Sequence, residues 1–332
     1  MSTGKNSITD VSKAAGVSIS TVSRVINKAP TVSIANRKKV EEAIRKLKFT
    51  PSPYAQALAR GQTNAVALII PRYEGIFYSF YALELIRGVG TLCDALKLDL
   101  LLHLTDGRDI FNVKSAAGII FADIIGNRTQ LEWALKENIP TVVVNNLIED
   151  LDVSCIAIDN LRGAKEAVNY LISLGHKRIA HITGDPISQA ANMRLEGYRL
   201  ALAENKIKEN PEYILKTNYS RGQARQATEK LLSLNVAPTA IFIASDAMAL
   251  EAIAVIMEKG KKVPDDISVI GFDDNPVSLY GAVSLTTVRQ PLIKMAEEGV
   301  KELHSLVKGK KEFRKVALPT ELIIRDSCKA VK

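Results

Sequence analysis

The sequence predicts a small all-α unit at the N-terminus and a much larger α/β body behind it. Two observations support this fold class. Short amphipathic helix patterns fill the first 50 residues, and strand-like apolar runs begin only at Ala65. From there, apolar runs alternate with amphipathic helix patterns, which is typical of doubly wound parallel sheets. The 332 residues suffice for two or three domains, each with its own core.

Residues 8–27 have the pattern of two short helices around a turn. Thr9 can cap the first helix, and Gly16 can adopt the positive φ that the turn requires. Ser18 or Ser20 can cap the second helix. The inward faces are expected to comprise Val11, Ala14 and Ala15 on the first helix and Val22, Val25 and Ile26 on the second.

The opposite side of the second helix carries small polar groups, one apolar tip and one guanidinium. A helix that lies in the DNA major groove presents groups of this kind to base edges and phosphates. The alternative is an ordinary helical hairpin with a solvated polar face. The residues on this side are Ile19, Ser20, Thr21, Ser23, Arg24 and Asn27.

A third helix and a short fourth one are expected before the body. Ser33 can cap the third, which ends before Thr50-Pro51 because the residue before a proline avoids helical angles. Residues 52–61 begin with Ser-Pro and end with Gly, as a helix of about two turns would. A helix this short is marginal in water, so the segment is either a linker or a switch that folds only when something packs on it. The inward positions of the third helix are Ile34, Val40, Ala43, Ile44 and Leu47.

The positive charge of the chain is concentrated in this N-terminal region. Residues 1–61 contain eleven Lys and Arg against three Asp and Glu, which equals the net charge of +8 of the whole chain. A basic headpiece on a neutral body is an electrostatic footprint for phosphate. The region lacks a basic amphipathic helix with bulky apolar anchors, so nucleic acid is favoured over a membrane surface.

Several classes of protein are not expected. No apolar run reaches membrane-spanning length, and residues 1–10 lack the apolar stretch of a secretory signal, which favours the cytoplasm. The cysteines and histidines fall in no metal-ligand spacing, and no metal or other cofactor is predicted. No nucleophile–base pair, P-loop or G-x-G-x-x-G motif is present, and RGVG at 87–90 is too weak to indicate an enzyme. The cysteines are Cys93, Cys155 and Cys328.

The body contains two successive doubly wound units, because the alternation of strands and helices restarts after Asp159. Such a pair forms a cleft at the carboxyl ends of its strands. The first series of apolar runs is VALIIPRY, LDLLLHLT, AGIIFADI, TVVVNNL and CIAIDN, and the second is RIAHITG, YILKTNY, AIFIASD and ISVIGFDD.

With these segments in place, the chain resembles the LacI/GalR family of bacterial transcription repressors over nearly its whole length. The resemblance rests on seven segments in family order: ITDVSKAAGVSISTVSRVIN, VSIANRKKVEEAI, PSPYAQALARGQT, RLEGYRLAL, ASDAMALEAI, ISVIGFDD and LTTVRQP. It implies a homodimer that binds a palindromic operator in double-stranded DNA, and hence association with the nucleoid. Three parts follow: a helix-turn-helix headpiece (1–50), a hinge helix (51–61) and a body (62–332) similar to periplasmic binding proteins.

The resemblance also implies which headpiece residues contact DNA. Ile19, Ser20 and Arg24 would contact base edges, with Arg24 suited to guanine and Ile19 to a thymine methyl group. In the hinge helix, Leu58 would be the wedge that opens a central base step in the minor groove, and Ala55 a close contact. A contact between Leu58 and the body is the alternative. The expected phosphate contacts are Ser7, Thr21, Ser23 and Asn27.

In the body, the resemblance places one subdomain at 62–159 plus 291–318 and the other at 160–290 plus 319–332. A small effector, expected to be a sugar or a related polar metabolite, would bind between them, because carboxylates, a guanidinium and aromatic faces suit polar rings. Arg194 and Asp273 could instead form a structural ion pair, and Tyr219 could be a core residue. The implied effector residues are Phe77, Tyr78, Arg194, Tyr219, Ser245, Asp246 and Asp273.

The sequence departs from the family pattern in the first subdomain. The 105–117 connection between two predicted strands is too short for the usual helix, so a helix is expected to be missing there. The turn around Phe77 and Tyr78 is longer than usual. A DNA-binding regulator controlled by a protein partner, or by no effector, therefore remains an alternative; a transport-type binding protein is disfavoured by the basic headpiece and the missing signal sequence.

Overall fold

The computed structural model describes residues 7–26, 29, 31–47, 49, 64–73, 76–108 and 116–331, and the structural statements below concern those residues. The headpiece and the body are separate compact units and are described one at a time. Asn27, the segment 51–61 with Ala55 and Leu58, and residues 109–115 of the short connection lie outside the described residues.

The headpiece consists of three helices, α1 (Ile8–Ala15), α2 (Ile19–Ile26) and α3 (Ile34–Lys46). The prediction that Thr9 caps α1 is wrong, because the cap is Ser7. The Ser7 hydroxyl accepts from the Asp10 backbone N–H, and the Asp10 carboxylate accepts from the Ser7 N–H in return. Gly16 has a φ of +63° at the end of α1, as predicted, and Ser33 caps α3.

A small core of short side chains holds the three helices together. Ala14 and Ile34, both predicted to face inward, are instead exposed, and Ile34 is the first residue of α3. The rest of the predicted core is confirmed. Its buried members are Val11, Ala15, Val22, Val25, Val40 and Ala43, with Ile26, Ile44 and Leu47 packed against them.

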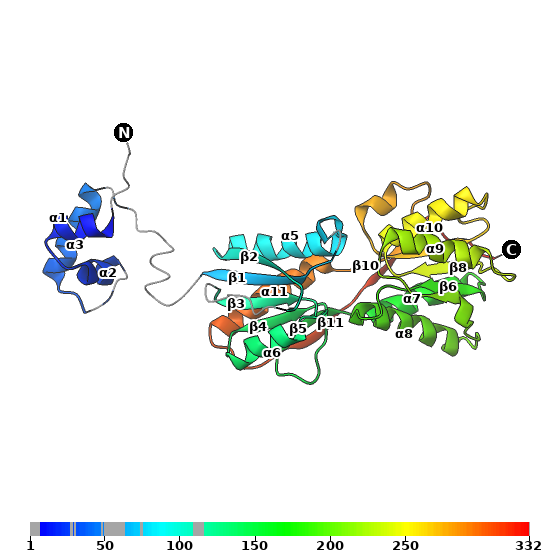
Figure 1. Cartoon of the computed structure of the whole chain (residues 1–332), viewed down its shortest axis with the longest axis horizontal. Coiled ribbons are helices and arrows are strands. Elements are labelled where there is room, and N and C mark those ends of the chain that lie inside the picture. Colours follow the sequence, from blue (N-terminus) through cyan, green and yellow to red (C-terminus); the bar gives the residue numbers. More distant parts are fainter. Residues whose placement is uncertain are drawn as a thin grey trace. The chain divides into compact units, whose positions relative to one another are not determined.

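The first sheet of the body has the strand order β11-β5-β4-β3-β1-β2 (Figure 1). The β1–β3, β3–β4, β4–β5 and β5–β11 pairings are all parallel. Helices α5 and α11 pack on one face with a shared apolar cluster, and α6 packs near β4. The elements are β1 (Ala65–Pro71), η1 (Ile76–Tyr78), α5 (Phe80–Ala95), β2 (Asp99–Thr105), β3 (Gly118–Ala122), α6 (Arg128–Lys136), β4 (Thr141–Val144), β5 (Ser154–Ile158), α11 (Leu292–Val307) and β11 (Lys315–Leu318).

The second sheet has the order β12-β10-β9-β8-β6-β7 and is parallel except for β12, which runs antiparallel to β10. The chain enters this sheet after β5, leaves it after β10 for α11 and β11, and returns for β12. The elements are α7 (Asn160–Ser173), β6 (Ile179–Ile182), α8 (Gln189–Glu204), η2 (Pro211–Tyr213), β7 (Ile214–Leu215), α9 (Arg221–Leu232), β8 (Ala240–Ile243), α10 (Asp246–Glu258), β9 (Ser268–Asp273), η3 (Pro276–Leu279), β10 (Thr286–Arg289) and β12 (Glu321–Ile323).

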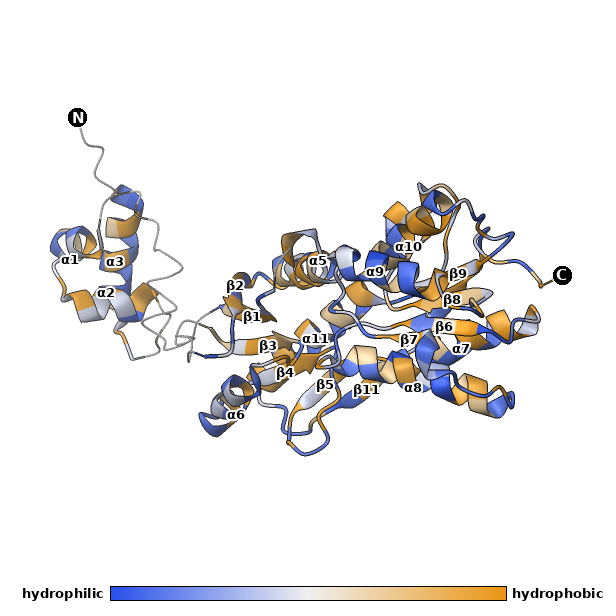
Figure 2. Cartoon of the chain, turned by 45° about the vertical axis from the view of Figure 1, so that its right-hand side comes forward, coloured by the Kyte–Doolittle hydropathy of each residue, from blue (hydrophilic) through white to orange (hydrophobic). Residues whose placement is uncertain are grey.

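Helices cover both faces of the second sheet, and this explains its continuous apolar strands. Along β6, Ile179 packs with α7 and α8, whereas Ala180 and Ile182 pack with α9 and α10. The strands of the first sheet are apolar as well. Figure 2 shows β1, β3 and β4 as largely hydrophobic, whereas the helices carry both hydrophobic and hydrophilic residues. The predicted fold class, a helical headpiece followed by two parallel-sheet subdomains, is confirmed.

Two further predictions can be compared with the structure only over the residues that it describes. Between β2 and β3 the described positions 106–108 and 116–117 contain no helix, and the remainder of the connection is not described. Among the described helices, none has the length and apolar character needed to cross a membrane.

Candidate functional site

One side of α2 is exposed and lacks bulky apolar side chains apart from a single isoleucine. Ile19, Ser20 and Arg24 are all exposed on it, and Ile19 keeps 48% of its surface accessible. Val22 and Val25 anchor the opposite side in the headpiece core. The helix therefore presents the three side chains predicted to contact bases.

The residues predicted to contact phosphate differ in their surroundings. The Ser7 hydroxyl donates to the Asp10 carboxylate, so it also belongs to the cap of α1. Thr21 shares a hydrogen bond with Ser18, whose hydroxyl accepts the Thr21 backbone N–H at the start of α2. Ser23 is half-buried, and Asn27 is not described.

In the body, the most heavily bonded of the predicted effector residues is Arg194 of α8, which is only 4% exposed. Its Nε donates to Asn160 Oδ1 at 2.9 Å, and its Nη atoms donate to the Ala244 carbonyl and to Gln290 Oε1. The guanidinium lies 3.8 Å from the centre of the Phe272 ring, close enough for a cation–π contact. These acceptors are uncharged, so the arginine is held in place without a direct ion pair.

The local sequence RLEGY explains how Arg194 is positioned. One turn after Arg194, Gly197 packs against α7 so closely that a Cβ would lie 2.3 Å from the Leu161 carbonyl oxygen. The next residue, Tyr198, is fully buried and donates to the Ile179 carbonyl at 2.9 Å. The glycine and the tyrosine thus fix α8 against the sheet.

Asp273, the last residue of β9, lies near Arg194. Its carboxylate accepts a hydrogen bond from Gln290 Nε2, and its φ of +136° is one that side chains rarely adopt. Burial raises the pKa of Asp273, and the charge of Arg194 opposes that rise. Arg194 therefore interacts with Asp273 through space rather than through a salt bridge.

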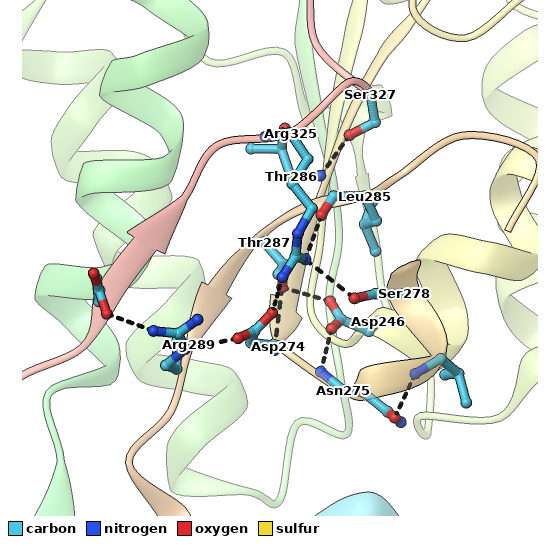
Figure 3. A network of polar contacts seen from close by, with 12 residues as sticks. Asp246, Asp274, Asn275, Ser278, Leu285, Thr286, Thr287, Arg289, Arg325 and Ser327 are labelled. Atoms are coloured by element: carbon cyan, nitrogen blue, oxygen red, sulfur yellow. Dashed lines mark hydrogen bonds and ion pairs between the residues drawn. The ribbon is translucent and has the colours of Figure 1, made fainter. Parts of the chain in front are cut away.

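Asp246 and Ser245 lie at the start of α10, behind Asp273. Ser245 caps the helix, and Asp246, whose polar contacts are drawn in Figure 3, is fully buried. The two oxygens of Asp246 accept from Thr287 Oγ1 at 2.6 Å and from the Asn275 N–H at 2.8 Å. Burial, together with the nearby charge of Asp273, raises the pKa of Asp246. Both side chains therefore bond to their own chain.

The three aromatic residues predicted to contact the effector differ in their surroundings, and only Tyr219 lies among the charged residues. Tyr219 has a φ of +66°, and its ring occupies the space that a side chain at Gly184 would fill. The charges of Arg194, Asp273 and Asp123 all act on its hydroxyl, so Tyr219 lies among the cleft residues.

Phe77 and Tyr78 lie in η1 and are 58% and 92% exposed. Tyr73, which follows β1, keeps 44% of its surface accessible. Its partial burial and the charges of Asp123 and Asp273 raise its pKa. Tyr73 is therefore the aromatic residue that this part of the chain brings to the cleft carboxylates.

Sequence reasoning missed the polar groups of the first subdomain. Asp123 directly follows β3, and Asn145 and Asn146 directly follow β4; all three are buried. Asn145 Nδ2 donates to Asp123 Oδ2 at 3.0 Å, whereas Asn145 Oδ1 has no partner. The signal was available, because polar residues immediately after buried parallel strands lie at the edge where ligands bind.

A side-chain amide joins the two subdomains beside this site. Gln189, the first residue of α8, accepts from the Leu147 N–H at 2.8 Å and donates to the Leu147 carbonyl at 2.9 Å. Leu147 follows Asn145 and Asn146 in the first subdomain. The body thus brings polar side chains from both subdomains into one region.

Comparison with known proteins identifies the class of protein that this arrangement defines. Residues 7–52 match the model of bacterial regulatory proteins of the lacI family, and residues 168–328 match that of the periplasmic binding protein-like domain. The chain thus joins a DNA-binding headpiece to a ligand-binding type of body.

Relatives extend the match over the full length. The HTH-type transcriptional regulator DegA of Bacillus subtilis (strain 168) is 36% identical, with 97% of this chain and 98% of the relative covered. The probable HTH-type transcriptional repressor ExuR of the same organism is also 36% identical, with 96% and 97% covered. The chain belongs to the LacI family.

Two solved structures have the same architecture. The lac repressor dimer bound to operator and the anti-inducer ONPF has a TM-score of 0.83 at 27% identity, with 98% of this chain and 100% of that chain covered. A complex of the transcriptional regulator CelR with cellobiose has a TM-score of 0.74 at 27% identity, with 97% and 99% covered. The protein is therefore a DNA-binding transcriptional regulator with a ligand-binding body, and its relatives are regulators rather than enzymes.

Proposed function

We propose that the protein is a homodimeric repressor that binds a palindromic operator and that a small polyhydroxylated ligand, a sugar or a related metabolite, controls this binding. The observation that carries the proposal is the convergence of Arg194, Asp273 and Tyr219 with Asp123 and Asn145 from the other subdomain. A guanidinium, carboxylates and an aromatic ring are suited to hydroxyl groups and to the C–H face of a sugar ring. The cellobiose complex of CelR supports this ligand class.

Control requires that the ligand bind two arrangements of the body unequally. The subdomains proposed are 62–159 with 291–318 and 160–290 with 319–332, and the division of strands between the two sheets supports them. Contacts that cross from one subdomain to the other, such as Gln189 to Leu147, would change when the subdomains move. Arg194, Asp273 and Tyr219 are the proposed ligand contacts, with Asp123 and Asn145 added to them.

In the headpiece we propose that α2 enters the major groove. Ile19, Ser20 and Arg24 would read bases, and the exposure of all three supports this role. Ser7, Thr21, Ser23 and Asn27 would contact phosphates. The segment 51–61 would be a hinge helix in the minor groove, a proposal that rests on the sequence.

One experiment tests DNA binding and ligand control together. Bound duplexes would be selected from random DNA with the purified full-length protein, with and without a panel of sugars and nucleosides. A palindromic consensus whose binding one compound changes would support the proposal. A palindrome that responds to no compound would favour control by a protein partner, and the absence of any enriched sequence would contradict the DNA-binding role.

The minor-groove wedge has its own test. Leu58→Ala should weaken binding to the selected operator while leaving binding to unrelated DNA nearly intact, because only the specific complex requires an opened base step. Titrations of both DNAs at one salt concentration measure the two effects. Equal losses on both DNAs would contradict the wedge role.

A further inference from the structure

Among the described residues, two carboxylates of the proposed effector site share one nearby guanidinium. Asp123 follows β3 in the first subdomain, and Asp273 ends β9 in the second. The charges of both act on the hydroxyls of Tyr73 and Tyr219, so the two carboxylates lie in the same region. Arg194 is the cation whose charge reaches both carboxylates. One guanidinium therefore offsets the charge of only one of them.

Arg194 is also less available to a ligand than its charge suggests. Three of its N–H groups already donate to Asn160, Ala244 and Gln290, and Phe272 covers one face of the guanidinium. These bonds leave two of the five N–H groups, one on each Nη atom, for a ligand. The cation is thus largely engaged by the chain itself.

On the first-subdomain side, one buried acceptor lacks a donor. Asn145 Oδ1 is buried without a partner, and its amide nitrogen already donates to Asp123. A buried acceptor without a donor costs free energy that a ligand hydroxyl or ammonium group could recover. A second carboxylate placed here would add a like charge instead.

We propose that this site, whose role as the effector site rests on the proposed function above, accepts neutral or amine-bearing polyhydroxylated rings and rejects acidic ones, and that Asp123 sets this charge selectivity. The relevant chemistry is donation of O–H or N–H groups to Asp123 and Asn145. Uronates and sugar phosphates present negative charge to the same carboxylates and are excluded.

The protonation of the site supports this selectivity. Burial raises the pKa of Asp123 to about 6, so the carboxyl group is mainly ionised at pH 7.5 and depends on nearby donors. Lower pH neutralises the group and weakens the repulsion of an acidic ligand. The titratable and charged groups that interact with Asp123 are Arg194 of α8, Tyr73 beyond β1, Tyr81 of α5 and Tyr219.

The test uses matched sugar series at pH 7.5 with the full-length protein. Glucose, glucosamine and glucuronate form one series, and the galacto and manno series repeat it; isothermal titration measures each affinity. We expect the neutral or amino member of the responding series to bind at least tenfold more tightly than its uronate. Asp123→Asn should reduce severalfold the ratio of the two affinities, that of the neutral or amino sugar to that of its uronate. Asparagine, like aspartate, is among the residues found at positive φ, here 103°. Asp152→Asn, the same change at an exposed site, is the matched control.

The wild-type protein provides a second measurement that does not depend on a variant. Lowering the pH from 7.5 to 5.5 should reduce the ratio of the affinity for the neutral sugar to the affinity for the uronate, because Asp123 gains a proton while the uronate stays ionised. A uronate that binds most tightly, or a ratio unchanged in Asp123→Asn and at pH 5.5, would overturn the charge inference and leave the small-ligand proposal standing. Failure of every member of every series to bind would instead overturn the small-ligand proposal itself.

Discussion

The two sides of the cleft differ in how firmly their polar groups are held. On the second-subdomain side, Arg194 and Asp246 bond to neighbours in their own chain, and so does the Asp273 carboxylate. On the first-subdomain side, Asp123 bonds to Asn145, whose carbonyl oxygen is unpaired. The polar groups of the first arrangement are held by the chain itself, whereas the second retains one unpaired acceptor.

A network of ion pairs explains the rigidity of the second-subdomain side (Figure 3). Asp274, which follows the strained Asp273 and has a φ of +56°, accepts from Arg289 at 2.7 Å and also pairs with Arg325. Arg325 in turn donates to the Leu285 carbonyl and to Ser278 Oγ. The final segment of the chain thus fixes the β9–β10 loop, which begins at Asp274 directly after Asp273. We propose that the second subdomain contributes mainly to ligand affinity and the first to ligand selectivity.

Removal of Arg194 should have the largest effect. Arg194→Ala leaves the acceptors at Asn160, Ala244 and Gln290 without their donor, at a cost of about 3 kcal/mol or more of unfolding free energy. Arg194→Lys keeps the charge but loses the planar fork, so we expect less destabilisation with loss of the ligand response. Urea unfolding and ligand titration measure the two effects. Wild-type ligand affinity in the lysine variant would contradict the preorganised role.

The contribution of Asp123 to stability should depend on pH. Its folded-state pKa of about 6 exceeds the ordinary value of 3.8, so folding favours the protonated form and the wild type loses stability as the pH rises from about 4 to about 6. Asp123→Asn lacks this loss, and its stability relative to wild type should rise by up to about 3 kcal/mol across that window. Urea unfolding at pH 4.5 and 7.5 measures the change. A difference that is constant with pH would show that Asp123 is not buried as described.

Disruption of the Asp274 network should have an intermediate effect. Asp274→Ala leaves the half-buried Arg325 without its carboxylate, and we expect a loss of about 2 kcal/mol of unfolding free energy together with weaker ligand binding. Glu321→Ala is the matched control, since it removes only an exposed partner of Arg289 and should cost less than about 1 kcal/mol. Similar losses in both variants would mean that the network does not support the β9–β10 loop.

The smallest effect concerns the aromatic residues of the first subdomain. Tyr73→Phe removes a hydroxyl near Asp123 and Asp273 and should lower ligand affinity by up to about tenfold, equivalent to about 1.4 kcal/mol. Tyr78→Phe changes a side chain that is 92% exposed and should have a much smaller effect. Titration of the same ligand into both variants measures the two effects. A larger loss of affinity in Tyr78→Phe would mean that Tyr78, and not Tyr73, is the tyrosine that contacts the ligand.

The sequence could predict the features that depend on local pattern. Gly16 and Ser33 mark helix ends, and the apolar strands define both sheets. The cap of α1 was misassigned because Ser7 and Thr9 are both suitable residues, and only the reciprocal bond with Asp10 decides between them.

The rest of the site depends on contacts between distant segments. Asp274 pairs with an arginine 51 residues away, which no local pattern reveals. The charges of the carboxylates act on Tyr73, whereas Tyr78 is exposed, and no local sequence pattern distinguishes the two tyrosines. Asp123 was visible in the sequence as a polar residue after a strand, but its pairing with Asn145 requires the β3–β4 register.

The most direct test of the central claim is an operator titration with and without the responding ligand, in wild type and in Arg194→Lys. Fluorescence anisotropy with the selected operator gives the Kd in each case. Control through the cleft predicts that the ligand changes the wild-type Kd at least fivefold and leaves the variant Kd nearly unchanged, while both proteins bind the operator similarly without ligand. An equal ligand-induced shift in both proteins, or none in wild type, would contradict control of DNA binding through this cleft.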